Sequence, residues 1–188
     1  MLYADSRRAA RRDADGRYVP LTEQNVALWN RDAIDEAEVL LRAASALARP
    51  GRFQLEAAIQ SAHASRRRAG ATDWDAIAAL YDALLALTGS RVVAVNRAIA
   101  VARARGAAEG LRLLEEADAE GALAGYQSYW AARADLQARI GDRAGAAASY
   151  NMAIGLETDA ATRAFLLERL AALGPDAARL GQIPARSG

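Results

Sequence analysis

Apolar residues recur at three- and four-residue intervals along most of the sequence, which is the spacing that gives a helix one apolar face. Turns that contain glycine interrupt this spacing and separate one apolar stripe from the next. The pattern therefore predicts an all-α protein whose amphipathic helices are joined by short turns.

The segment 13–68 is the less regular part of this pattern. Residues 2–12 are expected to be the end of a helix, because no N-cap residue precedes them, and sequence upstream of it is therefore expected. After a turn, Thr22 is a candidate N-cap for a helix over about 22–47, and another helix is expected over about 53–68. We expect these to be helices specific to one family.

A regular repeat follows over residues 72–173. Its three pairs of apolar stripes cover about 73–105, 107–140 and 142–173, and each pair spans about 33 or 34 residues, the period of tetratricopeptide (TPR) repeats. The predicted fold class is thus a right-handed stack of antiparallel helix pairs, a TPR-like α-solenoid in which each pair buries its apolar face against its neighbour.

Small residues and capping residues support this division of the repeat. Ala78 and Ala147 stand where a close contact between helices requires a small side chain, and Asp142 is a candidate N-cap. The whole chain, 1–188, is expected to form a single helical domain with a tail at 174–188.

Composition narrows the possible functions. The 188 residues include 53% hydrophobic residues, a net charge of +1 and no cysteine. The balanced charge gives no long-range attraction to nucleic acid or to an anionic membrane, and the absence of cysteine excludes disulfides and thiol chemistry. No apolar stretch is long enough to span a membrane, and we expect a cytoplasmic protein.

Few residues indicate catalytic or ligand chemistry. His63 is the only histidine, and we expect it to have a structural role near a helix end. The basic runs 7–12 and 66–68 lie at expected helix ends, where cations are common, and no aromatic residues interleave with them. Phosphate-binding, dinucleotide-binding and nucleophile-elbow motifs do not occur. We expect no enzyme activity, no cofactor, no metal and no direct nucleic-acid binding.

Aromatic and polar residues within the repeat are candidates for partner contact. Tyr126 and Trp130 are four residues apart on one expected helix face, which either packs into the core or lines a concave groove. Asn96 and Arg97 interrupt an apolar helix, and they either bond nearby carbonyl groups or contact a partner.

Several segments, taken together, resemble one family of bacterial proteins. The match at residues 15–31 is DGRYVPLTEQNVALWNR against the family's DG-x-LV-x-L-x-DQDRSLWDR. Further matches are PGRFQLEAAIQSAHA at 50–64 against PGPYQLQAAIAAVHA, TDWDAIAALYDALL at 72–85 against TDWAQIAALYDAL, VVAVNRAIAVA at 92–102 against PVVALNRAVAVA, and AARADL at 131–136 against AARADLL. The chain resembles extracytoplasmic-function (ECF) sigma factors that carry a long C-terminal helical extension, often described as TPR-like.

This resemblance implies a regulatory part of a longer protein. MLYADSRRAAR, at the start, is similar to the family's MLLHDARRAAR, which lies well inside the family's chains, and the promoter-binding domains lie upstream of it. In the family the extension modulates the sigma factor and carries no catalytic residues. Asn25, Val26 and Asn30 replace two acids and an arginine of the family motif, so the contacts of those charges are not expected here.

We therefore expect a regulatory protein-interaction domain of an ECF-type sigma factor, which acts in transcription initiation. Its expected partners are the sigma-factor core domains, RNA polymerase or a signalling protein, and no membrane. The candidate contact residues are Gln24, Trp29, Arg31, Gln54, His63, Asn96, Arg97, Tyr126 and Trp130. The alternatives are a stand-alone TPR-like scaffold that binds a peptide or partner protein, and a ligand-sensing helical domain.

Overall fold

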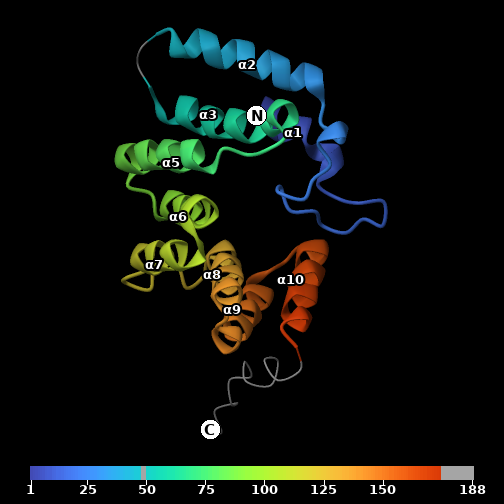
Figure 1. Ribbon diagram of the computed structural model, residues 1–188, viewed down its shortest axis with the longest axis vertical. Coiled ribbons are helices and arrows are strands. Elements are labelled where there is room, and N and C mark those ends of the chain that lie inside the picture. Colours follow the sequence, from blue (N-terminus) through green and yellow to red (C-terminus); the bar gives the residue numbers. More distant parts are fainter. Residues whose placement is uncertain (48–49, 175–188) are drawn as a thin grey trace, which may run out of the picture. The chain divides into compact units, whose positions relative to one another are not determined.

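The computed structural model describes residues 1–47 and 50–174, and within these residues the chain is helical (Figure 1). The predicted all-α fold class is confirmed, since neighbouring helices pack as pairs and the described residues form no strand. The α-helices are α1 (Leu2–Ser6), α2 (Arg31–Ser45), α3 (Arg52–Ala64), α4 (Arg66–Ala69), α5 (Trp74–Thr88), α6 (Arg91–Arg105), α7 (Ala107–Ala117), α8 (Gln127–Ile140), α9 (Arg143–Leu156) and α10 (Ala160–Ala172). Short 3-10 helices cover Arg8–Ala10 (η1) and Val26–Leu28 (η2).

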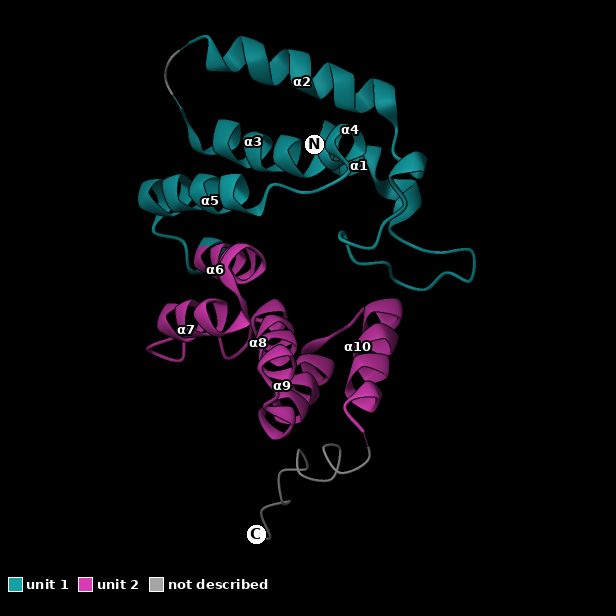
Figure 2. Cartoon of the chain, in the orientation of Figure 1, with its two compact units in different colours: residues 1–93 teal, residues 94–188 magenta. Residues whose placement is uncertain are grey.

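Contacts divide the chain into two compact units, Met1–Val93 (unit 1) and Ala94–Gly188 (unit 2), coloured separately in Figure 2. Unit 1 holds helices α1–α5, and unit 2 holds most of α6 and helices α7–α10. That the chain is a single domain stays a prediction. The predicted tail lies outside the described residues from residue 175 onward.

In unit 1, α3 is the central helix, since it packs against α1, α2 and α5. The expected helix over 22–47 is wrong in its first part. Thr22 lies in a turn, and the Asn25 side chain accepts a hydrogen bond from Ala27 N (3.0 Å) to begin η2. The chain is extended at Trp29 (φ −78°, ψ 133°) before α2 begins.

The N-cap of α2 is Asn30, whose Oδ1 accepts a hydrogen bond from Ala33 N at 3.1 Å. Asn and Asp are equally good N-caps, because either side chain offers an oxygen to the free amide groups of the first turn. The replacement of acids by Asn25 and Asn30 relative to the sigma-factor motif therefore keeps the local structure while it removes two charges.

Other helix ends in unit 1 follow the sequence more closely. Gly70 ends α4 and Gly89 ends α5, both with positive φ, a conformation that glycine adopts without strain. The expected helix over 53–68 is divided at Ser65 into α3 and α4. Asp73 is the N-cap of α5, through a 2.9 Å bond from Ala76 N to its carboxylate.

Unit 2 consists of consecutive helices that pack as neighbours. Helix α7 packs against α8, α8 against α9, and α9 against α10. The division into TPR-like pairs at 73–105, 107–140 and 142–173 stays a prediction. Asp142 begins α9, as expected, and Asp159 begins α10. The core of α6, α7 and α8 contains Val95, Ala98, Ala102, Leu114, Leu123, Tyr129 and Leu136.

Small residues allow close approach between the helices of unit 2. Gly110 of α7 lies against α6, and a Cβ atom there would be 2.8 Å from the Ala98 carbonyl oxygen and 2.9 Å from Ala102 Cα. Ala147 is fully buried, as its place in the repeat predicts, and so is Ala78 of unit 1. Such contacts leave no room for a larger side chain.

Candidate functional site

Trp29 is the centre of a buried polar cluster in unit 1. Its side chain is 3% exposed, and its backbone lies between η2 and α2. The next residue, Asn30, donates its backbone N–H to the Ser6 carbonyl (2.8 Å), which joins this segment to the end of α1. We call Arg7, Gln24, Trp29, Gln60, His63 and Arg66 the Trp29 cluster.

Two arginine side chains lie over the Trp29 ring. The guanidinium carbon of Arg7 is 5.8 Å from the ring centroid, and that of Arg66 is 5.2 Å from it. At these distances a cation is attracted to the negative face of an indole. The sequence predicts that both arginines belong to ordinary cationic helix ends. Arg7 does lie at a helix end, as the C-cap residue of α1, but its side chain is buried, with 9% exposed.

The hydrogen-bond acceptors of these arginines are neutral oxygens. Arg66 donates to the Thr22 carbonyl at 2.7 Å and to the Gln24 carbonyl at 2.8 Å, and Arg7 donates to Gln60 Oε1 at 2.5 Å. Gln24 Nε2 in turn donates to the Val19 carbonyl at 3.2 Å. Arg66 thereby holds the irregular segment that precedes Trp29 against α4.

Positive charge and burial act together on the titratable groups. Burial lowers the pKa of Arg7, and the nearby cations Arg11 and Arg66 lower it further. Burial is also the main cause that lowers the pKa of His63 to about 4, with smaller contributions from Arg7 and Arg66. His63 is therefore neutral at pH 7, and its ring contacts Trp74 edge to face, with centroids 5.5 Å apart.

Three atoms of the Trp29 cluster are buried without a hydrogen-bond partner: Arg7 Nη1, Gln24 Oε1 and Trp29 Nε1. Native proteins pair the great majority of buried polar atoms, so a group of unpaired ones in one place requires an explanation. The Trp29 side chain also packs in the apolar core of unit 1, with Tyr3 and Ile34.

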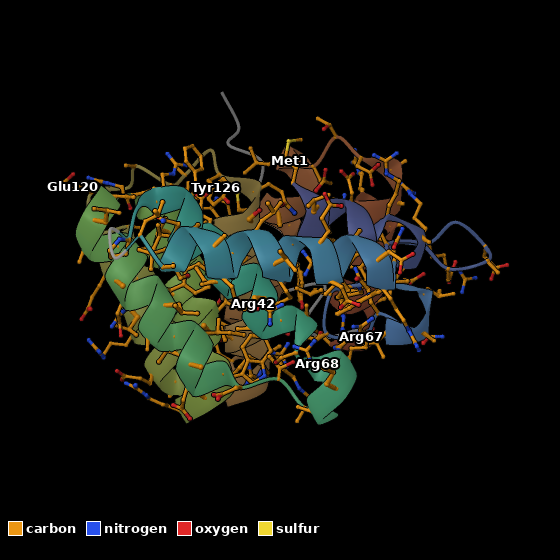
Figure 3. All side chains as sticks on the ribbon, turned by 90° about the horizontal axis from the view of Figure 1, so that it is seen from above. Met1, Arg42, Arg67, Arg68, Glu120 and Tyr126 are labelled. Carbon is orange, nitrogen blue, oxygen red and sulfur yellow. The ribbon has the colours of Figure 1, made fainter. Side chains whose placement is uncertain are left out.

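A second feature of unit 1 is an apolar stripe on the outer side of α2. Figure 3 looks onto this side, where α2 lies in front of α3. Asp32, Glu36, Val39, Leu40 and Ala43 are exposed, and their spacing places them along one stripe of α2, which the exposed Leu47 follows in the turn after the helix. Acidic residues occupy its first half and apolar residues its second half.

The apolar half continues onto α3 and is hollowed. Val39 is 59% exposed, Leu40 56%, Leu47 71% and Phe53 79%. A hollow of about 250 Å³ is lined by Leu40 and Phe53 among others, and a neighbouring hollow of about 310 Å³ shares Leu41, Ala44 and Gln54 with it. We call Val39, Leu40, Leu47 and Phe53 the α2–α3 apolar face.

The candidate residues of unit 1 are partly brought together. Gln24, Trp29 and His63 belong to the Trp29 cluster, and Gln54 lines both hollows. The Gln54 side chain also has a structural role, because it donates to the Ala44 carbonyl (3.1 Å) and accepts from Gly51 N (2.5 Å). Arg31 is exposed at the first residue of α2.

The candidates of unit 2 are more dispersed. Asn96 and Arg97 are half-buried on α6. Tyr126 is the N-cap residue of α8, and Trp130 lies within it; both pack partly buried against the core of α6, α7 and α8. The Trp130 indole donates to the Ala124 carbonyl at 2.8 Å, so this pair favours the core alternative.

Sequence reasoning missed Arg7, Gln60 and the α2–α3 apolar face. Arg7 follows the buried Tyr3 by four residues and precedes the buried Ala10 by three, so helical spacing places it on the apolar side. For the face, residue type alone does not separate the exposed Val39 and Leu40 from the buried Ile34, because all three are apolar residues of one helix.

Two other kinds of site, a metal centre and a membrane span, are not found in the described residues. No group of three or more His, Cys, Asp or Glu side chains in residues 1–47 and 50–174 is placed to hold a metal ion. Over the same part of the chain, no helix has the length and apolar character needed to cross a bilayer.

Comparisons with known proteins extend over different parts of the chain. A family of unknown function (DUF6596) matches residues 1–45, a span that includes Arg7, Gln24 and Trp29 but ends before α3. An uncharacterized protein of Rhizobium meliloti (strain 1021) is 36% identical over 182 residues, which are 97% of this chain and 43% of that relative. The chain thus spans less than half the length of this curated relative. No solved structure matches the chain.

Proposed function

We propose that this chain is a regulatory protein-interaction domain of an ECF-type RNA polymerase sigma factor and acts in transcription initiation in the bacterial cytoplasm. The sequence matches at 15–31, 50–64 and 92–102 support the proposal because they occur in the family's order along one chain. The greater length of the similar Rhizobium protein is compatible with further domains next to such a region.

The observation that carries the proposal is the α2–α3 apolar face. Single exposed apolar side chains are common on protein surfaces, whereas contiguous apolar patches with a polar margin mark contact sites. Here Leu40 and Phe53 line one hollow, and each has more than half of its side chain exposed. Such a surface gains free energy when a partner covers it, because apolar area is removed from water.

The acidic residues at the start of the α2 stripe indicate which kind of partner surface would complement it. The stripe on α2 begins with the exposed acids Asp32 and Glu36 and continues with Val39 and Leu40. An amphipathic helix that is apolar along one side and basic at one end complements both halves. We propose that this helix belongs to the promoter-binding core domains of the same sigma factor, and that its capture controls their availability to RNA polymerase.

Co-purification tests this proposal. Tagged 188-residue chain is mixed with the separately produced core domains of the sigma factor, and the retained protein is measured for wild type and for a Leu40→Glu, Phe53→Ser double variant. We expect wild type to retain the core domains and the double variant to lose them. Circular dichroism should remain unchanged, since both side chains are exposed.

Leu167→Ser is the matched control, because Leu167 is 48% exposed on α10 and lies outside the α2–α3 apolar face. It should retain the core domains as well as wild type does. Failure of the wild-type chain to retain the core domains would refute the proposed function. Trp29→Ala is unsuitable as the test variant, because Trp29 is buried and its truncation affects folding.

A further inference from the structure

The α2–α3 apolar face has charges of opposite sign at its two ends. Asp32 and Glu36 are exposed in the first half of α2, on the stripe that continues into the apolar residues. At the other end Arg52 is exposed as the first residue of α3, and its guanidinium carbon is 6.0 Å from the ring centroid of Phe53. Arg52 Nε donates to Glu56 Oε1 at 2.8 Å, an exposed pair within one helix that leaves a group with five N–H donors able to contact a further carboxylate.

The basic end of the face lies beside the C-terminal half of α2. Gln54, in the first turn of α3, donates its Nε2 to the Ala44 carbonyl at 3.1 Å, and Ala44 and Phe53 line the same hollow. Glu36 lies about two helical turns before Ala44, roughly 12 Å along the axis of α2. The apolar residues of the face therefore lie between the acids and Arg52.

A surface with this order of charges is complementary to itself. In a dimer with two-fold symmetry the same patch of both subunits meets, so each contact between two different residues occurs twice. When two copies of α2 lie antiparallel, their apolar halves cover each other, and the end that carries Glu36 meets the end that carries Arg52 of the second copy. Opposite charges then meet and like charges stay apart.

We propose that the α2–α3 apolar face pairs two copies of this chain around a two-fold axis, with Glu36 of each copy opposite Arg52 of the other. Burial of apolar area drives the pairing, because Leu40, Leu47 and Phe53 are 56%, 71% and 79% exposed in the single chain. The two charge contacts fix the antiparallel direction of the α2 helices and exclude the parallel one.

Pairing regulates the surface that the proposed function assigns to the sigma-factor core, and this part of the inference rests on that proposed function. The second copy covers Leu40 and Phe53 until the core domains displace it. By mass action, the fraction of chains with a covered face rises with the concentration of the chain and falls with the concentration of the core domains.

Sedimentation equilibrium of the 188-residue chain alone tests the pairing. Across the micromolar range of concentration, the average mass should rise from the 19.9 kDa of one chain toward twice that value. Leu40→Glu, Phe53→Ser should keep the mass of one chain, with unchanged circular dichroism, since both side chains are exposed. Leu167→Ser, outside the face, should pair as wild type does.

Charge reversals locate the contact between the two copies. Glu36→Arg places two cations together and Arg52→Glu places two carboxylates together, so each variant should pair at least tenfold more weakly than wild type. An equimolar mixture of these two variants should regain the wild-type affinity, because both contacts of the mixed dimer again join opposite charges.

Glu168→Arg is the matched control, since it makes the same change of charge at an exposed position of α10. It should pair as wild type does. When it is mixed with Arg52→Glu, it should give less mixed dimer than Glu36→Arg gives, which separates a specific contact from attraction between net charges.

Three results would overturn the pairing: the mass of a single chain at every concentration, a dimer that survives Leu40→Glu, Phe53→Ser, and no gain of affinity when Glu36→Arg and Arg52→Glu are mixed. Because these measurements contain no core domains, their failure is distinct from failure of the proposed function. Addition of the core domains to the wild-type dimer should give complexes with one copy of the chain, and a complex that retains the paired chains would overturn the regulatory role.

Discussion

Units 1 and 2 differ in how many of their buried polar atoms lack a hydrogen-bond partner, since unit 2 has Arg133 Nε as such an atom and unit 1 has several. In unit 2, the buried Ser149 hydroxyl donates to Gln137 Oε1 at 2.7 Å, and Gln137 Nε2 donates to Asp142 Oδ2 at 3.0 Å. Asp142 also begins α9, so this network joins α8 to α9 and satisfies its own members. In unit 1, the Trp29 cluster leaves a guanidinium nitrogen, an indole nitrogen and an amide oxygen unpaired.

The two units also differ in their apolar surfaces. Unit 2 exposes large apolar side chains singly, such as Ile140 on α8 and Leu167 on α10. In unit 1, Leu40 and Phe53 of the α2–α3 apolar face line one hollow, while Leu28 and Leu87 are exposed outside this face. The difference supports the proposal that unit 1, rather than unit 2, carries the surface that contacts a partner.

The largest stability effect is expected from acid, and it should arise in unit 1. Burial and two arginines hold the pKa of His63 near 4, whereas an unfolded histidine titrates near 6.5. Below pH 6.5 the unfolded state binds this proton more readily, so stability is lost as the pH falls toward 4, by up to about 3 kcal/mol. Denaturant unfolding between pH 7 and pH 4 measures it.

His63→Phe is the control for this prediction. It keeps an aromatic ring against Trp74 but cannot bind a proton, so its stability should depend less on pH over this interval. If wild type and His63→Phe lose stability in parallel, His63 is not buried in its neutral form and the environment assigned to the Trp29 cluster is incorrect.

The next largest effect tests the close packing of unit 2. Gly110→Ala places a Cβ atom against the backbone of α6 at Ala98 and Ala102, and it should lower the free energy of unfolding by about 1–3 kcal/mol. Gly155→Ala, on α9, meets no atom within 4 Å and should stabilise the chain by a few tenths of a kcal/mol to about 1 kcal/mol. Urea unfolding measures both variants. If Gly110→Ala and Gly155→Ala changed the free energy of unfolding equally, the close contact of α7 with α6 would be contradicted.

A smaller effect tests the satisfied network of unit 2. Ser149→Ala removes the hydroxyl that donates to Gln137 Oε1 and leaves that oxygen buried, at a cost of about 1–2 kcal/mol. Ala153→Ser adds a hydroxyl at another fully buried position of α9 that lacks this partner, so it should also destabilise the chain. Thermal unfolding measures this effect. If Ser149→Ala left the unfolding midpoint unchanged, the network would add nothing to stability.

The sequence predicts the helices of unit 2 better than those of unit 1. Gly141 marks the end of α8 and Asp142 marks the start of α9, and both signals are local in the sequence. The positions of these two helices along the chain are therefore predicted closely. In unit 1, Trp29 has helical spacing relative to its neighbours, but Asn25 and Asn30 each begin a new element. Side-chain capping therefore overrides the apolar period there.

The candidate site was predictable only in part. Gln24, Trp29 and His63 stand out in the sequence because of their residue types and motif. Arg7 and Arg66 do not, because their meeting over Trp29 depends on contacts between α1, η2 and α4 that are distant in sequence. The α2–α3 apolar face was hidden for a similar reason, since only packing shows which apolar side of α2 remains uncovered.

The central claim is that unit 1 binds a sigma-factor core through the α2–α3 apolar face, and calorimetric affinity tests it most directly. Titration of the core domains into the 188-residue chain should give one-to-one binding that Leu40→Glu, Phe53→Ser weakens at least tenfold, or about 1.4 kcal/mol, while Leu167→Ser does not. Equal affinities of wild type and the double variant would contradict the claim.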